Sequence, residues 1–187
     1  MLGGSLASSS GEARSRRPDL AALRPFAAVV SFLVFLTVLS GGFVAGLQAG
    51  LVYNSFPTMN GQWVPEGLTL LEPLWRNFFE NATLVQFDHR VMAALLYLLI
   101  PALSFAILRR DPPPRLRLDV YLLLLMLGIQ VILGISTLLL HVPIPLAAAH
   151  QGGALLLFTL TLFVTRQIWD FGRVNEVSPV ARPLAAG

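Results

Sequence analysis

The sequence predicts an all-α integral membrane protein: a four-helix transmembrane bundle with both termini on the matrix or cytoplasmic side. Hydrophobic residues make up 55% of the 187 residues and charged residues only 12%, against roughly 25% charged in soluble domains. Long stretches carry no charge at all, and the arginines gather between and beyond those stretches. This pattern is typical of a membrane protein and argues against a soluble globule.

The charge-free stretches locate the helices. Residues 25–65, 91–108 and 120–165 contain no Asp, Glu, Lys or Arg, and about 20 apolar residues suffice to cross a bilayer. The third stretch is too long for one crossing. Pro143 and Pro145 indicate where it reverses, because prolines two residues apart break a regular helix. We predict helices at about 25–51, 85–108, 119–141 and 145–168.

The predicted organisation is one membrane domain, 25–168, between two tails. Residues 1–24 are rich in Ser and Arg and lack the apolar core of a secretory signal. They are either a transit-like segment or a basic tail that enforces topology. The C-terminal tail, 169–187, is expected to be disordered.

The arginines predict the orientation of the bundle. All thirteen basic residues are Arg, and only Arg76 and Arg90 fall on one side of the predicted helices. The positive-inside rule therefore places the other side, with both termini, in the cytoplasm or the mitochondrial matrix. A net charge of +3 is too small to indicate a nucleic-acid partner, so the expected environment is the lipid bilayer.

Several chemistries are excluded by residues that the sequence lacks. There is no Cys, which excludes disulfides, thiolate zinc sites and covalent heme attachment. No zinc-protease, phosphate-loop or nucleophile-elbow motif occurs either. The strong nitrogen ligands are three histidines, His89, His141 and His150.

His89 and His150 are the main candidates for a site, because an ionisable side chain inside a span indicates function. They lie at similar heights on helices that run in the same direction, as two axial ligands of a heme iron would. A plain hydrogen bond between helices is the alternative reading for each one. His141 is close in height, but its position at the proline turn favours a role at the membrane surface.

The neighbours of the two histidines fit a flat ring. Ala147, Gly153 and Ala154 leave room one turn from His150. Arg90 is expected to meet a heme propionate as a charge-assisted pair, while Asp88 caps the helix or pairs with a neighbour.

Glycines and a loop segment suggest further contacts. Gly42, Gly46 and Gly50 form a smooth face for a helix or a flat ring. Apolar residues at helical spacing in 68–82 predict an interfacial helix in the outer loop (52–84), either an anchor or a lid. In the same loop, Asn81-Ala-Thr83 matches a glycosylation sequon, although Thr83 serves equally as a helix N-cap.

Four motifs carry a family resemblance. They are GFVAGLQAGLVYNSFPTM at 42–59, FENATLVQFDHR at 79–90, LGISTLL at 133–139 and VPIPLAAAHQ at 142–151. Together they closely resemble the C-terminal half of heme A synthase, in the cysteine-free mitochondrial and alphaproteobacterial version. The resemblance runs from about residue 24 to 168. Gln48 departs from it, because an acidic residue is expected there.

The resemblance implies a function. Heme A synthase is a membrane oxidoreductase of heme biosynthesis that converts the C8 methyl of heme O to the formyl of heme A, for cytochrome c oxidase. Its fold is two four-helix halves, and the C-terminal half binds a heme b cofactor at positions matching His89 and His150. The family does not require a histidine at position 141. Catalytic residues lie in the other half, so none is predicted here.

The resemblance also implies partners and a location. The expected partners are heme O, heme O synthase, an electron donor such as ferredoxin, and cytochrome c oxidase assembly factors. A separate N-terminal half or a homo-oligomer is expected to complete the enzyme. The expected location is the mitochondrial inner membrane, or the plasma membrane in a bacterium. The alternatives are a non-catalytic bis-His heme b subunit for electron transfer or heme handling and, less favoured, a transporter or scaffold without heme.

Overall fold

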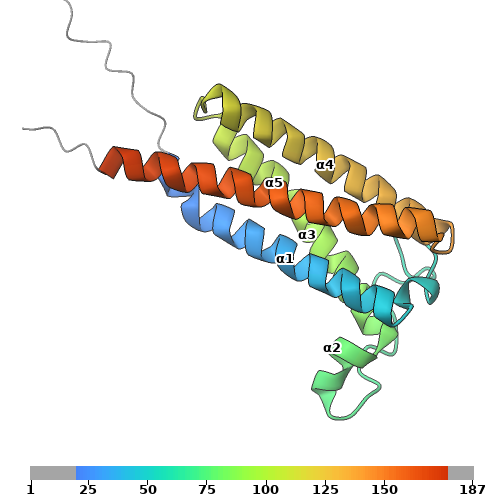
Figure 1. Cartoon of the computed structure of the whole chain (residues 1–187). Helices are drawn as coiled ribbons and strands as arrows, with labels where there is room; N and C mark the ends of the chain where they lie inside the picture. The colour runs from blue at the N-terminus through green and yellow to red at the C-terminus, as the bar shows by residue number, and fades with distance from the viewer. Residues whose placement is uncertain (1–19, 177–187) are drawn as a thin grey trace, which may run out of the picture.

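A computed structural model describes residues 20–176 of the chain, and the regular secondary structure in this range is helical (Figure 1). Four of its helices are long and apolar enough to cross a membrane, so the predicted all-α membrane fold is confirmed. These are α1 (Arg24–Gly46), α3 (Ala82–Leu108), α4 (Pro114–Leu139) and α5 (Ile144–Glu176). The short elements are η1 (Ala21–Leu23), η2 (Ala49–Leu51), η3 (Leu74–Arg76) and α2 (Asn77–Glu80).

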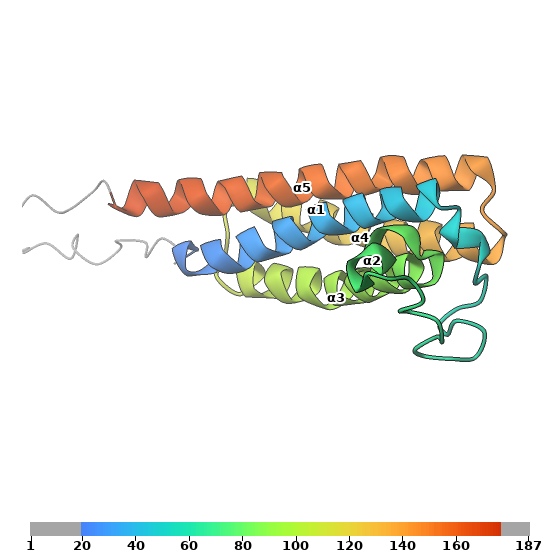
Figure 2. The ribbon, with the colours of Figure 1, turned by 90° about the horizontal axis from the view of Figure 1, so that it is seen from below.

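The long helices form one bundle, with α1 packed between α3 and α5, and α5 between α1 and α4 (Figures 1 and 2). Helices α3 and α4 contact each other much less. We call the end with residues 20–24, 109–113 and 166–176 the arginine end. The opposite end, with residues 47–81 and 140–143, is the loop end.

The apolar core fills the half of the bundle next to the arginine end. Its fully buried side chains come from all four long helices, and a hydrogen bond of 2.8 Å between Ser31 and Thr165 crosses it. In lipid, such close packing holds helices together mainly through van der Waals contact. The largest buried side chains of these helices are Val30, Val34, Ile100, Leu103, Ile107, Leu116, Val120, Leu123, Val164 and Ile168.

The half next to the loop end is built differently. There the buried hydrophobic side chains of the four long helices are few: Leu84 and Val85 in the first turn of α3, with Leu127 and Leu157 near the middle of α4 and α5. The interior instead contains glycines and polar groups, among them His89 and His150, both partly buried. The half next to the arginine end is therefore tightly packed with apolar side chains, and the half next to the loop end contains polar side chains.

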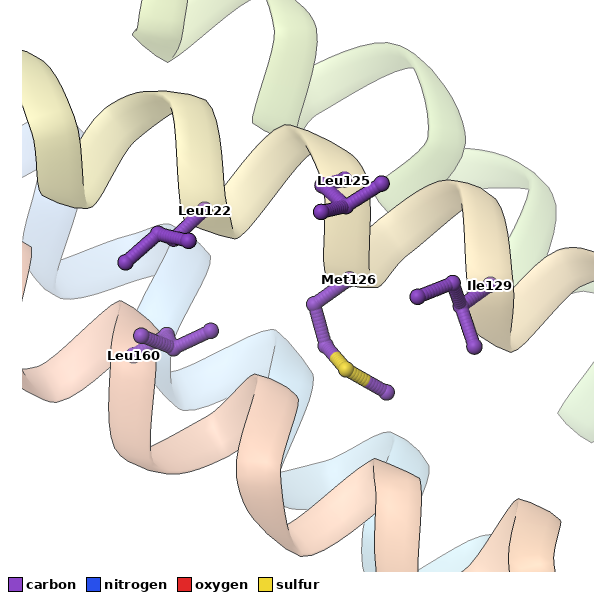
Figure 3. A pocket seen from close by; sticks show the side chains of 5 residues that line it. All are labelled: Leu122, Leu125, Met126, Ile129 and Leu160. Carbon is purple, nitrogen blue, oxygen red and sulfur yellow. The ribbon is translucent and has the colours of Figure 1, made fainter.

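The outer surface of the long helices is apolar, as a bilayer requires. On α4 and α5, a shallow hollow opens to this surface (Figure 3). No polar side chain and no histidine lines it, so it fits an acyl chain better than a reaction site. Its lining residues are Leu122, Leu125, Met126, Ile129 and Leu160.

Two helix ends differ from the prediction because of backbone turns that hydropathy does not reveal. Helix α1 ends at Gly46 rather than near residue 51, since Gln48 adopts a left-handed conformation with φ of 51°. Between α4 and α5, His141 (φ 61°) and Val142 (φ 59°) are both left-handed. For a β-branched residue this conformation is unusual. It produces the sharp reversal that the prolines predicted.

The tails also differ from expectation in part. Helix α5 continues to Glu176, through the start of the predicted C-terminal tail. At the other end, η1 begins inside the predicted N-terminal tail and leads directly into α1. Residues 1–19 and 177–187 lie outside the described part of the chain.

The predicted interfacial helix is shorter than expected, because the helical turns cover only 74–80. The segment before these turns is held by hydrogen bonds to the Asn77 side chain instead of by a helix. Asn77 Oδ1 accepts from the Leu71 amide at 3.0 Å, and Asn77 Nδ2 donates to Leu71 O at 2.8 Å. On the exposed side, hydrogen bonds from the Arg76 guanidinium lower the pKa of the Glu80 carboxyl. The loop end is thus ordered by side chains.

Asn81, rather than Thr83, is the N-cap of α3. Its Oδ1 accepts from the amides of Thr83 (3.0 Å) and Leu84 (3.4 Å). Its Nδ2 donates to Gly67 O at 2.7 Å and to Asn77 Oδ1 at 3.0 Å. Both hydrogens of this amide are therefore engaged and the side chain is buried, which makes the sequon unsuitable for glycosylation in the folded chain.

Candidate functional site

The structure brings His89 of α3 and His150 of α5 together in the half of the bundle next to the loop end. Their ring centres are 6.5 Å apart and the ring planes cross at 87°. Metal–imidazole bonds are about 2 Å long. Two imidazoles on opposite sides of one ion therefore have ring centres roughly 6 Å apart, close to the separation of this pair.

His89 is held from α1 by two consecutive residues. Ser40 Oγ lies 2.8 Å from His89 Nδ1. A Cβ atom at Gly41 would lie 3.3 Å from His89 Cε1, so glycine lets the ring rest against the α1 backbone. These contacts fix the direction and the depth of the ring.

His150 is held from α4, again beside a glycine. A Cβ atom at Gly134 would come within 2.9 Å of His150 Cε1, closer than real contacts allow. Gln130 Nε2 donates to the backbone oxygen of His150 at 3.0 Å. His150 Nδ1 is buried, and no side chain within 20–176 hydrogen-bonds to it. The polar protein group that faces the ring is the backbone oxygen of Gln130.

Arg90 lies beside His89 in sequence but reaches into the outer loop. Its guanidinium donates to the backbone oxygens of Tyr53 (3.0 Å), Ser55 (3.0 Å) and Thr58 (3.4 Å). Gln86, one turn earlier, also donates to Tyr53 O, at 2.9 Å. In the described part of the chain no carboxylate forms an ion pair with Arg90, so its positive charge is balanced only by carbonyl dipoles.

The other candidates lie elsewhere. His141 is exposed in the reversal between α4 and α5. Gly153, expected to leave room beside His150, packs against Met126 and Gln130 of α4 instead.

The glycine face of α1 also differs from its prediction. A Cβ atom at Gly42 or Gly46 would meet nothing within 4 Å, so neither glycine packs on another helix within residues 20–176. Gly50, beyond the end of α1, rests against Val142, where an added Cβ would lie 3.1 Å from Cγ2. The glycine that faces the histidine pair is Gly41, next to this predicted face.

Sequence reasoning missed Ser40, Gly41 and Gly134, which lie against the two imidazoles. Gly134 belongs to the motif at 133–139, and its place in that motif was the available signal. Ser40 gives no such signal, because a hydroxyl in a span usually bonds to its own helix.

The donor set points to one kind of bound group. Residues 20–176 hold no cluster of three or more His, Asp or Glu that suits a metal ion, whereas protein zinc sites use three or four ligands. Two facing imidazoles are instead the ligand set that helical bundles offer to a heme iron. Fold and site together define a membrane-spanning helical bundle with a paired-histidine centre.

Comparison with known proteins shows the family. The chain belongs to the COX15-CtaA family of cytochrome oxidase assembly proteins, whose pattern matches residues 4–162. It is 52% identical over 160 residues to the heme A synthase of Nitrosospira multiformis, covering 84% of this chain and 44% of that protein. It is 50% identical over 150 residues to the human heme A synthase COX15, covering 80% of this chain and 37% of that protein.

The similarity extends to plants and covers only part of each relative. The heme A synthase COX15 of Arabidopsis thaliana is 40% identical over 148 residues, 79% of this chain and 32% of that protein. The chain thus spans less than half the length of these relatives. No solved structure matches it.

Proposed function

We propose that this chain is the heme b-binding part of a heme A synthase, with His89 and His150 as the axial ligands. The observation that carries the proposal is the 6.5 Å separation of the two ring centres. Gly41 and Gly134 support it, because an added Cβ would crowd His89 at Gly41 and would come too close to His150 at Gly134. A heme bound here would supply one-electron redox chemistry.

The chain's own residues favour electron relay at this centre over attack on a substrate. His89 and His150 would both be used to hold the iron, so this centre would supply electron transfer rather than a place for water, oxygen or substrate to react. Arg90 would add a positive charge near the heme edge for a propionate, while it keeps the loop at 53–58 in place. Oxidation of the heme O methyl group would then take place in the part of the enzyme that this chain does not span.

A heme titration tests the ligand assignment. The full chain in detergent, titrated with heme b, should give a low-spin spectrum at one heme per chain. His89→Ala and His150→Ala should abolish that spectrum, whereas His141→Ala should retain it. Loss in His141→Ala together with retention in His150→Ala would overturn the assignment.

A second candidate function is a heme-binding electron-transfer or heme-handling subunit without catalysis. The chain covers less than half the length of the heme A synthases that it matches, which favours this function for the chain alone. Co-expression with the remaining N-terminal portion of the Nitrosospira enzyme discriminates between the two. Conversion of heme O to heme A by the pair, and by neither part alone, supports the synthase; failure of a folded, heme-loaded pair supports the second function.

The proposed topology places the arginine end in the mitochondrial matrix or bacterial cytoplasm. Eleven of the thirteen arginines of the chain support it. The proposed location is the mitochondrial inner membrane, or the plasma membrane in a bacterium. Proposed partners are heme O synthase, a ferredoxin-like donor, cytochrome c oxidase assembly factors, and an N-terminal half or a second copy of the chain.

A further inference from the structure

We propose that Ser40 makes the two imidazoles unequal ligands: it fixes His89 with its proton on Nδ1 and polarises that ring, whereas no side-chain hydroxyl accompanies His150. The inference rests on the proposed heme-binding function. It concerns a positioning residue on α1 that reaches the bound group only through His89.

The hydrogen-bond directions follow from what each atom can donate. Ser40 Oγ lies 3.1 Å from the Thr37 backbone oxygen and 2.8 Å from His89 Nδ1. A carbonyl only accepts, and a hydroxyl has one hydrogen. Ser40 therefore donates to Thr37 and accepts from His89, so the proton of the neutral ring is on Nδ1.

The opposite arrangement is unfavourable. If Ser40 donated to His89 Nδ1 instead, two acceptor oxygens would face each other 3.1 Å apart, with no hydrogen between them. With the proton on Nδ1, the lone pair is on His89 Nε2, the nitrogen that remains free for a metal. Metal-binding histidines usually donate their second N–H to such a partner, which raises the basicity of the ligand.

Two hydrogen bonds thus run in the same direction, from His89 to Ser40 and from Ser40 to Thr37. Each bond in such a chain polarises the next. Gly41 keeps the chain short, because any side chain there would push His89 away from α1. Ser40 and Gly41 thus position the His89 ring together.

His150 offers the contrast within the same molecule. Gly134 seats its ring against α4 as Gly41 seats His89 against α1, but no hydroxyl accompanies it. A backbone oxygen faces each ring, that of Thr37 at His89 and that of Gln130 at His150, but no side chain of the described residues hydrogen-bonds to His150 Nδ1. We therefore expect His89 to be the stronger electron donor of the two. Its polarisation would stabilise the oxidised iron and hold the reduction potential low.

Ser40→Ala removes this effect and is the test. In the heme-loaded full chain, the potential should shift to more positive values, and heme affinity should fall about tenfold, the lower end for lost outer-sphere partners. Ser40→Thr keeps the hydroxyl and should restore both values. Ser31→Ala is the matched control, because Ser31 also makes a 2.8 Å hydroxyl contact from α1, but to Thr165 in the apolar core.

A measurement without heme separates this inference from the proposed function. Nitrogen-15 NMR of histidine-labelled chain, assigned with His89→Ala, should show His89 protonated on Nδ1 in the wild type and mixed in Ser40→Ala. Protonation on Nε2 in the wild type would overturn the inference while leaving heme binding intact. A potential unchanged in a heme-loaded Ser40→Ala chain would also overturn it. Absence of heme binding in the wild-type chain would overturn both.

Discussion

The glycines beside the two imidazoles are as important to the site as the imidazoles themselves. The Cε1 edge of an imidazole can approach a helix backbone this closely only where no Cβ intervenes. Gly41 and Gly134 provide this on opposite sides of the pair. The distance between the rings is therefore determined by residues on α1 and α4, although the rings belong to α3 and α5.

Gly134→Ala should displace His150 and weaken heme binding, because the new methyl group would lie 2.9 Å from His150 Cε1. We expect at least a tenfold loss of heme affinity in a spectroscopic titration, comparable to the loss of an outer-sphere partner. Gly128→Ala is the matched control on the same helix, since a Cβ there meets nothing within 4 Å. Equal affinities of the two variants would show that Gly134 does not seat the ring.

The predictability of the site differs from residue to residue. His89 and His150 stand out from the sequence because ionisable side chains are rare within spans. Ser40 does not stand out, since its role depends on a rotation of α1 that places it opposite His89. The glycines are ambiguous for the same reason: Gly41 contacts His89, whereas its neighbour Gly42 faces open space.

Among the elements, the loop end is ordered by polar side chains to an extent that hydropathy does not anticipate. Arg90 and Gln86 hold the loop after η2, and Asn77 and Asn81 hold the segment before α3. The spans themselves were predictable, because absence of charge over 20 residues is a strong signal. Their ends were not, because left-handed turns at Gln48, His141 and Val142 leave no mark on hydropathy.

Asn81→Ala should loosen the start of α3, because it removes the N-cap and the bridge to Gly67 and Asn77. Loss of a cap costs about 1–2 kcal/mol. Faster amide exchange of residues 67–86 by mass spectrometry would check this. Thr69→Ala is the control, since Thr69 lies in an exposed part of the same loop. Unchanged exchange in Asn81→Ala would contradict the capping role.

At the scale of the whole molecule, the two halves of the bundle have separate tasks. The half next to the arginine end is a packed apolar core, and the half next to the loop end presents the histidine pair. Damage to the core should therefore lower stability without altering the ligand set.

Leu103→Ala tests this division. Leu103 is fully buried, and truncation of such a side chain typically costs about 2–5 kcal/mol. We expect a lower unfolding temperature in detergent and an unchanged low-spin heme spectrum. Leu98→Ala, on the same helix with 66% of its surface exposed, should change neither. An altered ligand set in folded Leu103→Ala would show that the halves are coupled.

The topology of the whole chain is directly testable because the native sequence has no Cys. Glu66→Cys, at the loop end, should react with a membrane-impermeant maleimide added to the outside of intact mitoplasts or spheroplasts. Asp111→Cys, at the arginine end, should react only after the membrane is permeabilised. The reverse pattern would invert the proposed orientation.

The central claim is that His89 and His150 hold one heme iron between them. Near-infrared magnetic circular dichroism of the oxidised, heme-loaded chain tests it most directly, because the band position identifies the pair of axial ligands. We predict the band of a bis-imidazole, low-spin heme at one heme per chain, lost in His150→Ala. A high-spin spectrum, or a bis-imidazole band that persists in His150→Ala, would contradict the claim.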